Sequence, residues 1–202
     1  MPPRFIARQL SHPSGLFGRI MGRLMNKHND KLNAYAVGQL DLTSVDRVLE
    51  IGFGGGVTLP SLVAVAALVG GVDRSSEMVR RAAARFSKEV SAGSAIFREG
   101  NVEDLPFEAC TFDKVCTVNT VYFWSSLAAA FSEIHRVLAP RGRVVVGFLP
   151  KQHMDRMGMP TDIFTSRTPE DVAAALVKAG FSEVRSARPE PTTAWIVMVG
   201  TR

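Results

Sequence analysis

The stretch VLEIGFGGGVTL, residues 48–59, places glycines at positions 52, 54 and 56 directly after a run of apolar residues. Glycine allows tight turns and lets a ligand touch the backbone, and a helix that follows such a loop offers unpaired N–H groups. The spacing is G-x-G-x-G, and Val57 stands where the dinucleotide-binding pattern G-x-G-x-x-G needs its third glycine. We therefore expect Gly52, Gly54 and Gly56 to form a binding loop for a ligand other than a nicotinamide dinucleotide.

Two acidic residues stand where a nucleoside-containing ligand would need them. Asp73 ends the next apolar run, LVGGVD, and lies about 20 residues after the glycines, a position from which a carboxylate accepts hydrogen bonds from ribose hydroxyls. Glu50, beside the glycine loop, could meet a cationic amino group. The alternatives are a helix N-cap for Asp73 and a solvated acid at a strand end for Glu50.

The elements that must position these residues alternate along the chain. Apolar, strand-like runs occupy residues 46–52, 68–73, 95–101, 112–119 and 141–149, with two more in the tail, and helix-like stretches occupy residues 57–67, 75–90, 127–140 and 168–181. Strands that alternate with helices pair in parallel. We predict an α/β fold with a Rossmann-like doubly wound seven-stranded sheet, mostly parallel with an antiparallel edge strand, and helices on both faces.

Composition indicates a single cytoplasmic domain. The chain has 202 residues, 46% of them hydrophobic, and contains neither an apolar run long enough to span a membrane nor a secretory signal. Cys110 and Cys116 suit a reducing compartment, and the four histidines fall into no metal-ligand spacing, so no metal is predicted. The net charge of +5 is concentrated between Arg4 and Lys31, without the dense basic run or interleaved aromatics that would favour nucleic acid.

Several motifs together resemble those of the class I S-adenosylmethionine-dependent methyltransferases, in the order that this family has them. VLEIGFGGG is similar to the family's first motif, GVDRSSEMV to its second-strand acid, REGNVEDLPFEACTFDKV to its third-to-fourth-strand segment, and EIHRVLAPRGRVVVGF to its fifth-strand segment. The closest likeness is to small bacterial enzymes akin to the ubiquinone/menaquinone-biosynthesis methyltransferases. The resemblance implies S-adenosylmethionine as cofactor.

Carried over to this sequence, the resemblance implies a set of cofactor-binding residues. Glu50 and the three glycines would form the wall for the methionine part, Asp73 would bind the ribose, and Met78 would contact the adenine. The family often has Gly-Asp-Ala after the third strand, and here Gly100, Asn101 and Val102 stand in its place. Asn101 keeps a carbonyl acceptor but loses the charge. The predicted cofactor residues are Glu50, Gly52, Gly54, Gly56, Asp73, Met78, Asn101, Val102 and Asn119.

Tyr122 and His153 are the candidate catalytic residues. Asn119 and Tyr122 have the spacing of the Asn-Pro-Pro-Tyr motif of methyltransferases that modify exocyclic amines, but both prolines are missing. An aromatic face near a sulfonium is favourable by roughly 0.5–2 kcal/mol, which favours Tyr122. His153 could act as a general base. The alternatives are packing at a strand end for the aromatic residues and a surface position for His153.

Two segments outside the common core are expected to select the acceptor. Residues 13–37 read as a basic amphipathic helix, which predicts either a lid over the cofactor cleft or a surface that meets anionic lipid. We assign residues 1–40 to an N-terminal helical lid segment and residues 41–202 to the S-adenosylmethionine-binding domain. The methionine-rich residues 149–164 form the second segment. We expect methyl transfer to a small-molecule or lipid-like acceptor, with methylation of RNA or non-catalytic nucleoside binding as the alternatives.

Overall fold

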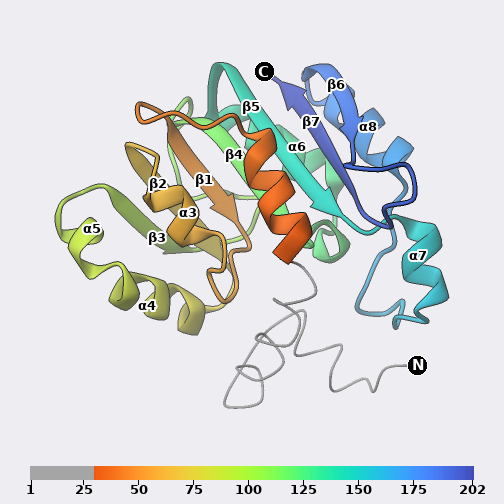
Figure 1. Ribbon diagram of the computed structural model, residues 1–202, viewed down its shortest axis with the longest axis horizontal. Coiled ribbons are helices and arrows are strands. Elements are labelled where there is room, and N and C mark those ends of the chain that lie inside the picture. The colour runs from red at the N-terminus through yellow and green to blue at the C-terminus, as the bar shows by residue number, and fades with distance from the viewer. Residues whose placement is uncertain (1–29) are drawn as a thin grey trace.

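Seven strands form one sheet in the described part of the chain, residues 30–202 of the computed structural model (Figure 1). The strands are β1 (Arg47–Ile51), β2 (Leu68–Asp73), β3 (Ala95–Glu99), β4 (Phe112–Val118), β5 (Leu138–Phe148), β6 (Ser182–Ala187) and β7 (Ile196–Thr201). Their order is β3-β2-β1-β4-β5-β7-β6, and all pairs from β3 to β5 are parallel. β7 is antiparallel to both of its neighbours, and β6 forms the edge. The predicted fold class is therefore confirmed.

Three of the helices, α4, α6 and α8, begin at side-chain caps. They are α3 (Leu59–Val63), α4 (Ser76–Arg85), α5 (Ser87–Ser91), α6 (Leu127–Val137), α7 (Lys151–Arg156) and α8 (Pro169–Lys178), with a 3-10 turn η1 (Val121–Phe123) and a further helix over residues 30–39. The Ser75 side chain accepts a hydrogen bond from the Met78 N–H and so caps α4. Thr168 and Asp171 form a capping box at the start of α8, which has Pro169 at its first turn.

The end of α6 differs from the sequence prediction. We expected a helix over residues 127–140 that stops at Pro140, but α6 ends at Val137 and β5 begins at Leu138. The backbone before a proline is driven toward extended conformations, and Leu138 is already extended, with ψ of 144°. Pro140 therefore lies inside the first part of the strand, where the pairing of β5 with β4 shifts register.

The two faces of the sheet are buried under different helices (Figure 1). Side chains alternate along β1, so Val48 points to the face covered by α3, α4 and the helix at residues 30–39, whereas Leu49 and Ile51 point to the face covered by α6 and α8. All three are at most 3% exposed. Complete burial of each such side chain contributes about 1.5–3 kcal/mol, so the strand is held between two cores.

The helix at residues 30–39 lies on the sheet. Leu32, Ala36 and Leu40 are at most 2% exposed and belong to the core of that face. A side chain at Gly147 would lie 3.0 Å from Leu32, so this glycine makes room for the helix. Residues 30–40 therefore cover a sheet face, and the lid predicted for residues 1–40 falls mostly on residues 1–29, outside the described residues. None of the helices within residues 30–202 is long and apolar enough to cross a membrane.

Candidate functional site

A cavity of about 130 Å³ opens at the carboxyl ends of β1, β2 and β4. The strand order reverses here, because β1 is followed on one side by β2 and on the other by β4, and open α/β sheets bind ligands at such points. Six of the nine predicted cofactor residues line the cavity, namely Gly52, Gly54, Asp73, Asn101, Val102 and Asn119.

The glycine loop has the backbone that the sequence predicted. Gly52 has φ of +70°, and a side chain there would collide with Thr120. Gly54 has φ of +50°, and the space that its side chain would occupy is open. Both positions therefore need glycine for conformational reasons, and the open side of Gly54 leaves its backbone accessible to a ligand.

Asp73 fixes this loop to the end of β2. Its Oδ2 accepts a hydrogen bond from the Gly54 N–H at 2.8 Å, and its Oδ1 accepts one from the Ser75 N–H at 2.9 Å. Hydrogen bonds to an ionised group are stronger than neutral ones. The carboxylate is 8% exposed and lines the cavity, so a preoriented acceptor faces the ligand space.

Glu50 lies beneath the loop, and it does not line the cavity as predicted. It is 5% exposed and shares a sheet face with Val48 and Cys116, because strand alternation turns it away from the cavity side. The Thr58 hydroxyl donates to Oε1, while Oε2 is buried without a hydrogen-bond partner among the described residues. The pKa of the Glu50 carboxyl is raised to about 7, because burial penalises its charge and Asp73 repels it.

Asn101 and Val102 form the wall that follows β3. Val102 is buried at 5% exposure, and Asn101 is exposed. The Asn101 Oδ1 accepts a hydrogen bond from the Glu103 N–H at 3.3 Å. Because this oxygen already has a partner within the loop, the amide NH₂ is the group that Asn101 presents to a ligand, as this side chain is oriented here.

The structure places Tyr122, a predicted catalytic residue, outside the lining of the cavity. Tyr122 is 4% exposed and does not line the cavity. Its hydroxyl accepts a hydrogen bond from the Leu149 N–H at 2.5 Å and donates to the Asn119 Oδ1 at 3.1 Å, and burial raises the pKa of the phenol. The phenol therefore joins the end of β5 to Asn119, which has φ of +58° and does line the cavity.

His153, Met78 and Gly56 are also placed away from the cavity. His153 lies on α7, half-buried, with its Nδ1 buried and without a hydrogen-bond partner in residues 30–202. Met78 and Gly56 line a second cavity of about 90 Å³ on the other side of the glycine loop, and a side chain at Gly56 would lie 2.9 Å from Leu59. The residues predicted as the general base and as the adenine contact therefore do not join the other predicted site residues in the first cavity.

Eight cavity residues are not among the predicted site residues, and four of the eight have polar or aromatic side chains. Arg74 follows Asp73, and Thr120, Phe123 and Trp124 surround Tyr122 in the chain. Arg74, Thr120 and Phe123 are each next to a predicted residue in the chain, and Trp124 is two positions after Tyr122. The tight turn η1 decides which aromatic side chains face the cavity, and this turn follows from long-range contacts such as that between Tyr122 and Leu149.

The resulting donor and acceptor set suits a nucleoside with an extended, charged tail. The cavity has one carboxylate, one guanidinium, two aromatic side chains and exposed glycine backbone. Asp73 can accept from sugar hydroxyls, and the apolar Val102 offers a surface for a base. In residues 30–202 no group of three or more His, Cys, Asp or Glu side chains could hold a metal ion.

Comparisons with known proteins identify the family. A methyltransferase domain model matches residues 49–146. The uncharacterised methyltransferase YdaC of Bacillus subtilis is 30% identical over 135 residues, which are 66% of this chain and 72% of YdaC. The ubiquinone/menaquinone biosynthesis C-methyltransferase UbiE of Rhizobium johnstonii is 36% identical over 75 residues, 37% of this chain, and the match spans only 29% of that protein's length.

A solved structure supports the same assignment at the level of the fold. The methyltransferase in a complex with the Haloferax volcanii Trm112 methyltransferase activator superposes with a TM-score of 0.77 at 19% identity, over 97% of this chain and 96% of that one. The cavity at the strand ends, the glycine loop and the sequence relatives lead to one conclusion: the chain belongs to the class I S-adenosylmethionine-dependent methyltransferases.

Proposed function

We propose that the protein transfers a methyl group from S-adenosylmethionine to a small or lipid-like hydrophobic acceptor that enters beside Phe123 and Trp124. The cofactor, when bound, supplies a methyl group already activated on a sulfonium. The observation that carries the proposal is the lining of the cavity. Among residues 30–202, Asp73 and Arg74 are the only ionisable residues that line it, and its acceptor-facing rim is aromatic.

The cofactor residues follow from the same lining. We assign the backbone of Gly52 and Gly54 to the methionine end, the Asp73 carboxylate to the ribose hydroxyls, and Asn101 with Val102 to the adenine. Each assignment rests on a group that faces the cavity: open backbone at Gly54, a buried carboxylate at Asp73, and an amide beside an apolar wall.

Positioning, rather than acid–base chemistry, is the contribution that we assign to the protein. No histidine, cysteine, lysine or glutamate from the described residues lines the cavity. Alignment of the acceptor with the methyl group and exclusion of water can lower the barrier by several kcal/mol, up to about 7–11 in well-oriented systems. Phe123 and Trp124 would exclude water and stabilise the positive charge on sulfur by roughly 0.5–2 kcal/mol.

The class of acceptor is inferred from the same rim. Phe123 packs on Phe164 with ring centroids 4.9 Å apart, and the Arg167 guanidinium donates to the Trp124 carbonyl. The segment after α7 thus meets the aromatic rim, which suits an apolar acceptor. The relative named for ubiquinone and menaquinone biosynthesis supports this class. The free thiols of Cys110 and Cys116 support a reducing, cytoplasmic location.

The test is a transfer assay with S-adenosylmethionine that carries a radiolabelled methyl group. The acceptor panel contains hydrophobic phenols, amines and quinones, phospholipid vesicles, and folded RNA. We expect label in a small or lipid-like acceptor, and we expect Phe123→Ala to reduce transfer far more than Phe97→Ala, a half-buried phenylalanine of β3 outside the cavity. Label in RNA alone, or equal losses in the two variants, would contradict the proposal.

A further inference from the structure

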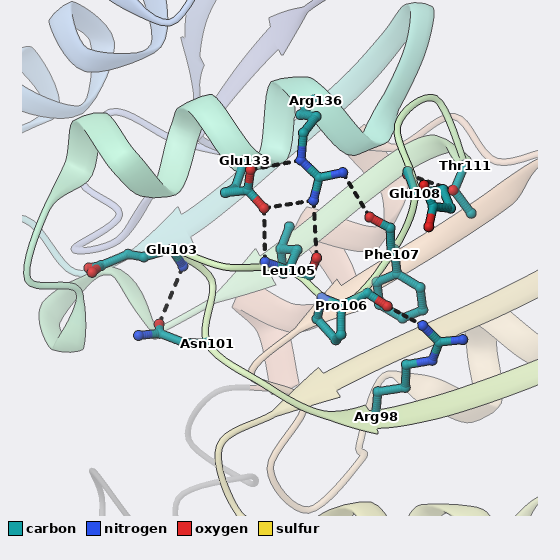
Figure 2. Close-up of polar contacts among 10 residues, drawn as sticks. All are labelled: Arg98, Asn101, Glu103, Leu105, Pro106, Phe107, Glu108, Thr111, Glu133 and Arg136. Carbon is teal, nitrogen blue, oxygen red and sulfur yellow. Dashed lines mark hydrogen bonds and ion pairs between the residues drawn. The ribbon is translucent and has the colours of Figure 1, made fainter.

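Glu133 and Arg136 of α6 grip the connection between β3 and β4 (Figure 2). Arg136 donates from Nη2 to the Leu105 carbonyl at 3.0 Å and from Nη1 to the Phe107 carbonyl at 2.8 Å. Glu133 accepts a hydrogen bond from the Leu105 N–H at 2.9 Å. The two side chains also bind each other through two hydrogen bonds of 2.7 Å. We call these two residues the α6 clamp.

The clamp is stronger than an ordinary surface ion pair. An exposed pair contributes about 0–1 kcal/mol, because water screens it and two side chains lose freedom. Here the side chains of Arg136 and Glu133 are 37% and 20% exposed, respectively. Each is also hydrogen-bonded to the backbone of the connection between β3 and β4. The Arg136 hydrogen bond lowers the pKa of the Glu133 carboxyl, so the charge that completes the clamp is retained near neutral pH.

The gripped backbone leads directly to the cofactor cavity. Pro106 lies between the two gripped residues, and its ring packs on Gly100 so closely that a side chain at Gly100 would lie 2.9 Å from Pro106 Cδ. On the other side, Asp104 donates its N–H to the Asn101 carbonyl at 3.1 Å. Gly100 and Asn101 both line the cavity, so two short routes connect the clamp to its wall.

We propose that Glu133 and Arg136 are positioning residues for cofactor recognition, acting through residues 104–107 on the wall formed by Gly100, Asn101 and Val102. Neither side chain lines the cavity, so neither touches the cofactor directly. The clamp fixes the distance between α6 and this wall. It thereby holds the Asn101 amide where it can form a hydrogen bond to the edge of the adenine, a role that rests on the adenine position in the proposed function. Loss of the clamp leaves the wall in place but broadens the positions that Asn101 adopts.

A matched control exists at the opposite end of the same sheet. Arg47 and Asp113 form a two-pronged pair, with Nε to Oδ2 and Nη2 to Oδ1 both at 3.0 Å, and similar exposure of 40% and 31%. Arg47 begins β1 and Asp113 lies near the start of β4, whereas the cavity is at the carboxyl ends of these strands. Breaking this pair should cost stability without changing the wall.

The experiment compares Glu133→Gln and Arg136→Lys with Asp113→Asn in the full chain. The midpoint of thermal unfolding is measured for each variant. At a temperature where every variant is folded, we then measure the Kd for S-adenosylhomocysteine and the ratio of that Kd to the Kd for the inosine counterpart, in which oxygen replaces the exocyclic amine and ring N1, an acceptor for the Asn101 NH₂ in adenine, carries a hydrogen. Arg136→Lys retains the charge and the aliphatic stem, so it stays informative even where Glu133→Gln fails to fold.

We expect the clamp variants to bind S-adenosylhomocysteine between about two-fold and thirty-fold more weakly, the range for residues that act on a site without touching its ligand. We also expect their discrimination between the adenine and inosine ligands to shrink, while Asp113→Asn keeps the wild-type affinity and ratio. The proposal is overturned by clamp variants that lose thermal stability but keep both binding quantities, or by equal changes in Asp113→Asn.

Discussion

The half of the sheet built from β1 to β3 and the half built from β4 to β7 use their polar residues in opposite ways. In the first half, the side chain of Asp73 and the backbone of the glycine loop face the cavity. In the second half, the groups with the more reactive chemistry are turned inward: the Tyr122 phenol bonds Leu149, and His153 lies on α7 away from the cavity. The difference teaches that the Tyr122 phenol supports the rim of the site, while glycine backbone and a carboxylate face the cavity.

The largest expected effect concerns Glu50, a buried acid of β1 that does not line the cavity. Its folded-state pKa of about 7 lies above the usual value near 4.5, so the native state keeps this proton between these pH values while the unfolded state loses it. The contribution of Glu50 to the free energy of unfolding is therefore fully present below about pH 4.5 and is lost as the pH rises to about 7. The total loss is about 3 kcal/mol.

Denaturant unfolding of the ligand-free protein between pH 4.5 and 8 measures this loss, with Glu50→Gln as the comparison. The amide cannot titrate, so the variant should lack this part of the decline while it keeps the size of the side chain. A variant with the same pH dependence as wild type would show that Glu50 titrates normally.

The second effect is on cofactor affinity. Asp73→Ala removes the acceptor for the ribose and also frees the Gly54 N–H from the loop. We expect binding of S-adenosylhomocysteine to weaken by about 1–3 kcal/mol, measured by calorimetric titration. Unchanged affinity would remove Asp73 from the site. Asp46→Ala, a half-buried acid that accepts hydrogen bonds from Thr43 outside the cavity, is the control and should bind normally.

Tyr122→Phe should act on stability rather than on chemistry. The variant leaves the Leu149 N–H without its phenol partner and removes the donor to Asn119, so we expect a loss of about 1 kcal/mol in the free energy of unfolding. The rate of methyl transfer at saturating substrate should stay within a few-fold of wild type below the unfolding transition. A loss of turnover by orders of magnitude at full folding would restore Tyr122 as a catalytic residue.

The smallest effect is expected for His153→Ala. Its Nδ1 makes no hydrogen bond within residues 30–202 and the side chain does not line the cavity, so we expect changes within about 0.5 kcal/mol in stability and a transfer rate close to wild type. The pH profile of transfer measures the same point independently. Disappearance of an inflection near neutral pH in the variant would mean that His153 does exchange a proton.

The sequence indicated which residues of the first half meet at the cavity, because the determinants of their placement are local. Glycines at 52 and 54 must adopt positive φ, Asp73 ends its strand, and strand alternation with helices fixes which ends meet. Glu50 was predicted to lie in the cavity wall. Side chains alternate along β1, however, and Glu50 points to the face opposite Leu49 and Ile51. The correct direction was therefore available from the alternation of β1 itself.

The acceptor half could not be predicted in the same way. The orientation of Tyr122 depends on Leu149, 27 residues later in the chain, and the packing of Phe123 depends on Phe164. Such contacts have no local signature. The α6 clamp is similar, because the segment EIHRVL contains Glu133 and Arg136 but only the fold shows that they bind Leu105 and Phe107.

A structure of the protein with S-adenosylhomocysteine bound would test the central claim most directly, namely that the first half of the sheet binds the cofactor and the second half only shapes the acceptor rim. We predict ribose hydroxyls within hydrogen-bonding distance of the Asp73 carboxylate, the adenine beside Val102, and the sulfur facing Phe123 or Trp124. A cofactor seated in the cavity beside Met78, or a sulfur that faces Tyr122 or His153, would contradict the account.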